Sequence, residues 1–147
     1  MNPWTYNNSP VEEIPEGCIG FVYKLTNTTN GKFYIGKKNF WSSQTKQKTV
    51  ILKTTGEKKK KKIRSKKESD WQTYHGSSED VQKDVELLGA ETFTREILRM
   101  CTTKGELSYY EAKYQFEEDV LLKPNQYYNG WISCKIHRAH LKHLLDK

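Results

Sequence analysis

Two short stretches near the start of the chain concentrate aromatic and β-branched residues between polar segments, a pattern typical of β-strands. Residues 19–26 read I-G-F-V-Y-K-L-T and residues 32–37 read K-F-Y-I-G-K. The segment between them ends in Asn30-Gly31, which supplies the positive φ angles of a tight turn. The pattern therefore predicts an antiparallel β-hairpin. Apolar positions at Phe93, Ile97 and Leu98 predict a third strand over residues 91–100.

Apolar residues at helical spacing predict the helices. Ser77, three residues before Asp80, resembles a capping box, and Gly89 is placed to end the helix that follows. Leu107, Tyr110 and Tyr114 give a later segment one apolar face. A short amphipathic helix is expected at the C-terminal end. The predicted helices cover residues 69–76, 77–88, 104–120 and 136–145.

The order of these elements predicts an α+β fold. Its centre is a small, mostly antiparallel three-stranded sheet flanked by helices, with a Lys-rich insert after the second strand. Residues 1–17 are rich in Asn, Pro and Glu and predict an irregular lead-in. The domain itself is predicted over residues 18–131, with the insert at 37–67, and residues 132–147 form the short C-terminal helix.

Composition narrows the class of protein. The 147 residues are 35% hydrophobic and 12% aromatic, which favours one small domain with an aromatic-rich core. No apolar run is long enough for a membrane span and the first residues lack a signal-peptide pattern, so a cytoplasmic location is expected. Three cysteines without C-x-x-C spacing argue for free thiols rather than disulfides or a zinc site. His137, His140 and His143 are expected to line a solvated helix face.

The net charge of +7 is unevenly distributed. Residues 37–67 hold 13 Lys or Arg and one acid, so the remainder of the chain has a net charge of −5. Because five adjacent lysines repel one another, residues 58–62 are expected to form a mobile loop or a frayed helix start. This segment could be merely solvated, or it could bind phosphates, as Lys clusters do. Charge alone fits RNA, DNA and an anionic membrane equally well.

Several residues of these elements are candidates for chemistry, and each also has a purely structural interpretation. Tyr23 and Tyr34 could be a simple cross-strand pair, but Gly36 in the second strand indicates the close approach of another group. Glu111 lies on the predicted sheet-facing stripe of its helix, where a carboxylate either extends to solvent or binds a hard cation such as Mg²⁺. His75 precedes a helix N-terminus, which is either a plain cap or an anion-friendly site.

Taken together, these residues resemble the GIY-YIG nuclease family. Gly20-Phe21-Val22-Tyr23 and, ten residues later, Tyr34-Ile35-Gly36 are similar to its paired signature, although Phe21-Val22 replaces the first Gly-Ile. His75-Gly76-Ser77-Ser78, Glu111 and Asn129 follow in the family's order, so the resemblance spans about residues 19–131. The insert and residues 69–78 look most like phage-encoded members, including homing-type endonucleases.

The resemblance implies a Mg²⁺-dependent DNA endonuclease, with Mn²⁺ as an alternative ion. Glu111 would hold the metal, Arg64 would clamp phosphate oxygens, and Tyr23, Tyr34 and His75 would orient or activate water. Gly36 and Asn129 would support the site. As a base at pH 7, Tyr23 would need its pKa lowered by about three units, a cost of about 4 kcal/mol. Lysines nearby favour that direction.

The implied partner is double-stranded DNA in a phage-infected bacterial cell, and the oligomeric state is left open. The proposed DNA contacts are Lys37, Lys38, Lys58, Lys59, Lys60, Lys61, Lys62, Lys66 and Lys67. Such contacts bind phosphates without reading the base sequence. Two alternatives are a non-catalytic nucleic-acid-binding module on the same fold and an interaction protein whose lysines bind acidic partners.

Overall fold

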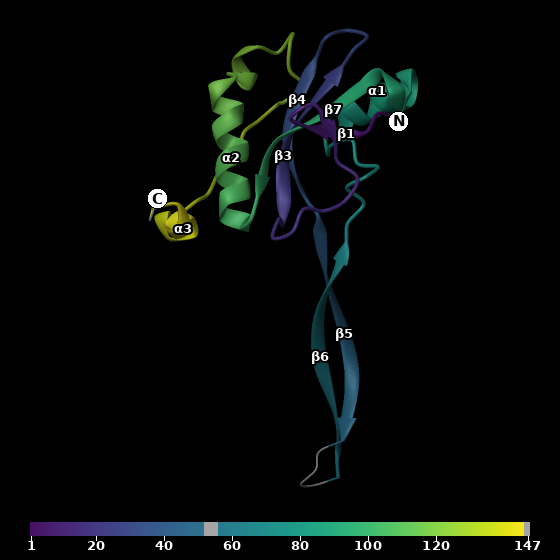
Figure 1. Ribbon diagram of the computed structural model, residues 1–147, viewed down its shortest axis with the longest axis vertical. Coiled ribbons are helices and arrows are strands. Elements are labelled where there is room, and N and C mark those ends of the chain that lie inside the picture. The colour runs from purple at the N-terminus through teal and green to yellow at the C-terminus, as the bar shows by residue number, and fades with distance from the viewer. Residues whose placement is uncertain (52–55, 146–147) are drawn as a thin grey trace.

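The computed structural model describes residues 1–51 and 56–145, apart from the side chains of residues 46, 48, 50 and 61–64. A compact body carries a long two-stranded arm (Figure 1). The strands are β1 (Trp4–Tyr6), β2 (Ser9–Pro10), β3 (Gly20–Asn27), β4 (Phe33–Asn39), β5 (Trp41–Ile51), β6 (Lys58–Glu68) and β7 (Phe93–Cys101). The helices are α1 (Glu79–Leu88), α2 (Lys104–Glu117) and α3 (Lys142–Leu145), with short turns η1 (Ala90–Thr92), η2 (Val120–Leu122) and η3 (Arg138–Leu141).

The α+β class is confirmed, but the expected three-stranded sheet is only the centre of a larger one. The strand order is β2-β1-β7-β3-β4, and β1 runs parallel to β7, so the sheet is mixed. The prediction of an irregular lead-in over residues 1–17 is therefore wrong for β1 and β2, whereas residues 11–17 contain no strand or helix. Trp4, which is 1% exposed, anchors β1 in the core. Strands of two and three residues are too short to show alternation in a sequence.

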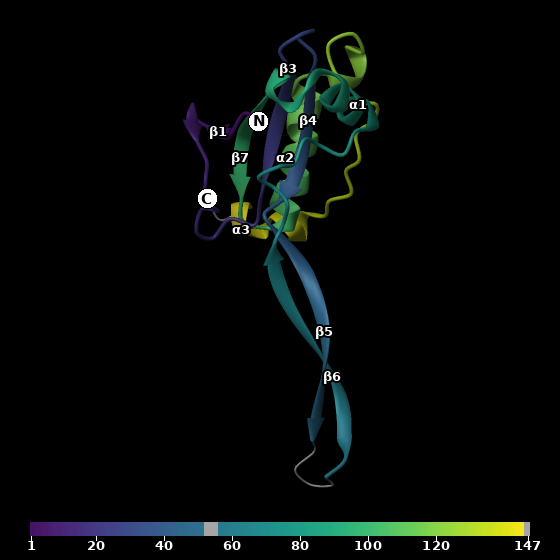
Figure 2. The same cartoon turned by 90° about the vertical axis from the view of Figure 1, so that its right-hand side faces the viewer.

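The two faces of the sheet carry two separate cores. Phe21, Tyr23 and Leu25 of β3 pack on one face together with Val81 of α1. Val22 points the other way and packs against Leu107 of α2. The two helices therefore cover opposite faces, as Figures 1 and 2 show. The aromatic and β-branched residues that predicted β3 therefore supply both cores.

The basic insert is a two-stranded antiparallel ribbon, not the expected mobile loop or frayed helix. Its register runs from Trp41 opposite Glu68 to Ile51 opposite Lys58. Figure 2 shows it extending away from the body. Successive positions of a strand face opposite ways, so adjacent lysines are separated by the ribbon itself. Backbone hydrogen bonds hold the two strands together while the charged side chains remain in water. Repulsion between the lysines therefore does not prevent the ribbon from forming.

The helices differ from their predictions mainly at their ends. Ser78, not Ser77, is the N-cap of α1, and its side chain accepts a hydrogen bond from Val81 N–H. Residues 69–76 form bends and turns, not a helix. Near the C-terminus only η3 and α3 are helical, and His143 contacts Glu106 at 3.1 Å, so it does not lie on a purely solvated face.

The cysteines are free thiols. No helix in the described ranges has the length and apolar character needed to cross a bilayer.

Candidate active site

The candidate site is built around β4, the strand at one edge of the sheet. An edge strand presents backbone groups that lack a neighbouring strand. Asn129 takes up those of Ile35: its Oδ1 accepts from the Ile35 N–H at 3.1 Å and its Nδ2 donates to the Ile35 carbonyl at 2.8 Å. Gln115 of α2 donates to the same carbonyl at 2.9 Å. This geometry suits the supporting position predicted for Asn129.

Glu111 of α2 reaches the same edge two residues farther along. Its carboxylate accepts a hydrogen bond from the backbone N–H of Lys37, and the positive charge of the Lys37 side chain also acts on it. Burial nevertheless raises the pKa of Glu111 above its ordinary value, because Lys37 only partly offsets the loss of solvation. Glu111 is therefore a desolvated carboxylate, and among the described side chains none forms an ion pair with it.

A cavity of about 580 Å³ opens in front of this carboxylate. Residues from β4, the N-terminal end of α1, α2 and the loop after Tyr128 line it. They include Tyr34, Ser77, Ser78, Glu111, Asn129 and Trp131. The cavity brings the predicted Tyr34, Glu111 and Asn129 together at one surface.

Tyr23 lies beneath this surface rather than in it. It pairs with Gly36 in the strand register and is only 1% exposed. A Cβ atom at Gly36 would lie 2.5 Å from the Tyr23 hydroxyl, so only glycine leaves room for the ring. The rings of Tyr34 and Tyr74 lie 6.2 and 6.0 Å away. Gly36 thus marks the close approach that its position predicted.

The electrostatics of Tyr23 oppose its expected activation. Burial, with smaller effects from Tyr74, Tyr34 and Glu111, raises its pKa well above the ordinary value. The charge of the neighbouring lysines, expected to lower that pKa, does not compensate. Tyr23 is therefore a protonated hydroxyl at neutral pH, hydrogen-bonded to Tyr74. Burial likewise raises the pKa of Tyr34, which keeps that hydroxyl protonated 3.5 Å from Ser77 Oγ.

The structure does not bring His75 to this cluster. Its Nδ1 donates to the Thr73 carbonyl at 2.9 Å, and its ring stands edge-on to Phe93. In the described part of the chain no hydrogen bond joins it to the hydroxyl of Tyr23 or Tyr34. Burial, helped by Arg95, lowers the pKa of His75, so the ring is neutral. His75 lines a different cavity from Glu111.

Arg64 is placed away from the site as well. Its backbone pairs with Thr45 in the arm, four residue pairs beyond the root pair Trp41–Glu68. At 3.3 Å per residue this is about 13 Å along the ribbon. The side chains of Arg64, Lys61 and Lys62 lie outside the described residues.

Three site residues were missed by sequence reasoning. Tyr74 contacts Tyr23, Gln115 supports Ile35, and Ser108 accepts a hydrogen bond from the Lys37 side chain at 2.9 Å. Gln115 lies four residues after Glu111 on α2, so helical spacing could have identified it. Tyr74 and Ser108 carried no comparable signal.

The carboxylates around this cavity suit a hard cation that is bound by the protein and by the substrate at the same time. Glu79 and Asp80 line the same cavity as Glu111. Yet no three His, Cys, Asp or Glu side chains in the described ranges cluster closely enough to hold an ion alone. Mg²⁺ commonly uses one or two carboxylates and completes its shell with water and substrate phosphate. The desolvated, incompletely paired Glu111 fits that use.

Comparison with known families agrees with this geometry. The family model described as "Putative endonuclease segE, GIY-YIG domain" matches residues 4–132. The match begins at the first residue of β1 and extends past Asn129, so it includes the whole sheet, the arm and the candidate site. No curated protein and no solved structure matches the chain.

Proposed function

The chain belongs to the segE-type GIY-YIG endonuclease family, and we propose that it is a Mg²⁺-dependent endonuclease that hydrolyses phosphodiester bonds of double-stranded DNA. The observation that carries the proposal is the meeting of Glu111, Tyr34 and the Tyr23–Gly36 pair around one sheet edge. Phosphodiester hydrolysis needs a cation to neutralise developing charge and donors to hold the phosphate and the water. This edge offers both.

Glu111 would hold the metal, with Mn²⁺ as an alternative ion. The bound ion would act as a Lewis acid on the phosphate. The protonated Tyr34 hydroxyl faces the cavity and can donate to a phosphate oxygen or orient the water. Tyr23 is buried and protonated, so we assign it a positioning role: it fixes Tyr34 and Tyr74 through packing and a hydrogen bond. Because both hydroxyls are protonated in the free protein, we assign neither tyrosine the role of general base.

Lys37 takes the place proposed from sequence for Arg64. Its backbone N–H binds the Glu111 carboxylate, and its side chain lies 2.9 Å from Ser108 at the exposed edge. A lysine there supplies a compact positive charge to a phosphate next to the metal ligand.

The arm would hold the duplex. A two-stranded β-ribbon fits the major groove of B-DNA, and phosphate contacts by lysines give affinity without base specificity. Lys58, Lys59, Lys60, Lys66 and Lys67 are exposed on β6, as this requires. The family description names an endonuclease, and we extend it to a phage, homing-type enzyme of low site specificity, because Lys-rich contacts dominate the arm.

A plasmid-nicking assay tests the proposal. Wild type should nick supercoiled DNA with Mg²⁺ and not with EDTA, and Glu111→Ala should lose activity. Glu117→Ala, an exposed change on the same helix that removes only a surface pair with Lys113, is the matched control and should nick normally. If wild type and Glu111→Ala nick equally, or wild type never nicks, the metal-nuclease function is refuted.

The non-catalytic alternative is favoured by one observation, the placement of Arg64 in the arm rather than at the edge. On that reading the chain binds DNA, with salt-sensitive affinity that depends on residues 58–62, and does not cleave it. Wild-type binding without any Mg²⁺-dependent nicking would select this function.

A further inference from the structure

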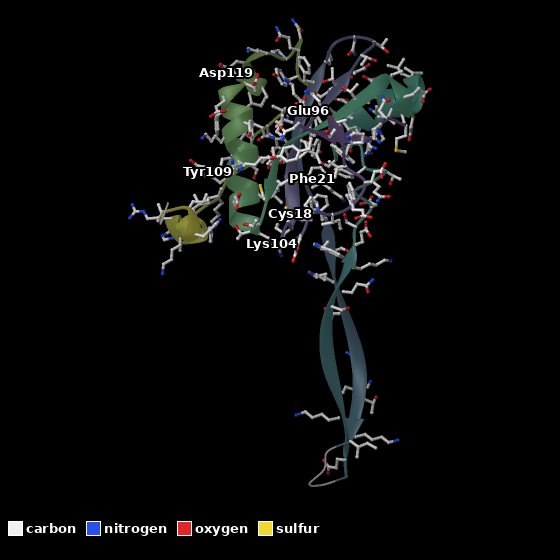
Figure 3. The ribbon with its side chains drawn as sticks, in the orientation of Figure 1. Cys18, Phe21, Glu96, Lys104, Tyr109 and Asp119 are labelled. Carbon is white, nitrogen blue, oxygen red and sulfur yellow. The ribbon has the colours of Figure 1, made fainter. Side chains whose placement is uncertain are left out.

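A second cavity, of about 540 Å³, lies where the arm joins the body. We call it the root pocket. The end of β4, the first residues of β5, the end of β6 and the start of α2 surround it. Figure 3 shows Lys104 at the end of α2 nearest the arm. Four of its lining residues are lysines: Lys37, Lys38, Lys66 and Lys104.

The root pocket is strongly basic. None of the residues that line it is acidic. Lys38 forms an ion pair with the exposed Asp70 at 2.6 Å, whereas Lys37, Lys66 and Lys104 have no carboxylate within ion-pair distance in the described part of the chain. Three concentrated, unneutralised cations repel one another, so the free energy of the pocket falls when an anion enters it.

Two aromatic side chains hold two of the four lysines in place, one of them the ion-paired Lys38. The Lys66 ammonium lies 4.7 Å from the centre of the Trp41 ring, and that of Lys38 lies 4.1 Å from the Tyr74 ring. Cation–π contacts of this kind fix a flexible side chain without neutralising it. The pocket is therefore preorganised for a ligand with negative charge.

The root pocket adjoins the candidate active site through two residues. Lys37 lines the pocket and also binds Glu111 through its backbone N–H. Tyr74 lines the pocket and forms a hydrogen bond with Tyr23. Lys37 and Tyr74 thus connect an anion in the root pocket to the groups proposed to cleave a phosphodiester bond.

We propose that the root pocket binds the backbone phosphates of the DNA strand next to the phosphate being cleaved, and so joins the arm to the active site. This inference rests on the proposed function. A polyanion that follows the arm toward Glu111 must pass the pocket, and its cations supply a continuous path. Lys66 and Lys104 would each neutralise a phosphate, since neither is part of the Glu111 site.

Salt-dependent binding tests the proposal without requiring cleavage. Fluorescence anisotropy of a labelled duplex would be recorded over a NaCl series, in EDTA, for wild type, Lys66→Ala, Lys104→Ala and Lys123→Ala. Lys123 is the matched control, because it follows η2 beyond the C-terminal end of α2, whereas Lys104 begins that helix. Each pocket variant should reduce the slope of log K against log salt by about 0.9 and weaken binding roughly five- to ten-fold at 0.1 M salt. Lys123→Ala should match wild type.

Different results overturn different claims. Unchanged slopes for both pocket variants refute the root pocket, whatever the nicking assay gives. Equal losses for Lys123→Ala would refute it too, since the effect would then be one of overall charge. If wild type does not nick DNA but the pocket variants still reduce the salt slope, the nuclease function is refuted and the pocket remains a DNA-binding site. Polyglutamate that competes as well as DNA of equal charge would show that the pocket does not select nucleic acid.

Discussion

Replacing Gly36 with alanine tests the packing that holds the two tyrosines. The added Cβ would lie 2.5 Å from the Tyr23 hydroxyl oxygen, 2.8 Å from the ring carbon that bears it and 3.0 Å from a ring carbon of Tyr34. Ordinary contact begins near 3.4 Å. The Tyr23 hydroxyl must therefore move by about 1 Å, although its ring is enclosed by Trp4, Phe21 and Tyr74.

Two effects of different size should follow. Overpacking of a filled core typically costs about 1–3 kcal/mol of unfolding free energy, which urea denaturation would measure. A displacement of about 1 Å in a positioned group can lower catalysis about 100-fold. We expect plasmid nicking by Gly36→Ala to fall by that factor at a temperature where the variant is fully folded.

Two further variants make the result interpretable. Gly130→Ala is the control, because a Cβ there meets no atom within 4 Å although it follows Asn129 directly. Adding Tyr23→Phe to Gly36→Ala removes the 2.5 Å contact and should restore part of the stability but not the nicking. A Gly36→Ala variant that nicks at the wild-type rate would refute the claim that this pair positions the site.

Three other changes have defined outcomes. Glu111→Gln should raise the melting temperature at pH 7, because burial raises the pKa of this carboxyl and its ionised form destabilises the fold; the gain should vanish below about pH 4, where the wild-type group is protonated. Asn129→Ala removes the partner of the buried Ile35 N–H and should cost about 1–3 kcal/mol in urea denaturation, with reduced nicking. Burial raises the pKa of Glu106, but bonds from His143 and others outweigh it and the net shift is downward. Glu106 therefore stabilises the fold above pH 4.5 and that stability is lost as pH falls further, so Glu106→Gln should flatten the acid limb of an unfolding curve below pH 4.5.

The parts of the fold that the sequence predicted share a local cause. The β3–β4 hairpin follows from aromatic and β-branched residues and an Asn-Gly turn, and Gly31 does adopt a positive φ of 74°. The start of α1 follows from a serine cap, and the face of α2 from apolar spacing. Each signal lies within a few residues of the structure that it specifies.

The sequence predictions that were wrong concern features that depend on contacts between residues far apart in the chain. β1 is a strand because Trp4 packs on Phe21 and pairs with Arg95, more than 90 positions away in the register. The arm is a ribbon because each of its strands has the other to pair with, whatever its charge. The high pKa of Tyr23 follows from its enclosure, while the sequence showed only the lysines near it in the chain.

The candidate site itself follows from the position of β4 at the sheet edge. Tyr23 and Tyr34 belong to the face covered by α1, and Glu111 comes from the helix on the other face. Two such groups cannot meet across the interior of a sheet, but they can meet around its edge. There the outward N–H of Lys37 is free to bind Glu111, and the same residue also lines the root pocket. A sixth strand paired to β4 would consume that N–H and close the cavity. Asn129 and Gln115 therefore bind the backbone N–H and carbonyl of Ile35 without adding another strand to this edge of the sheet.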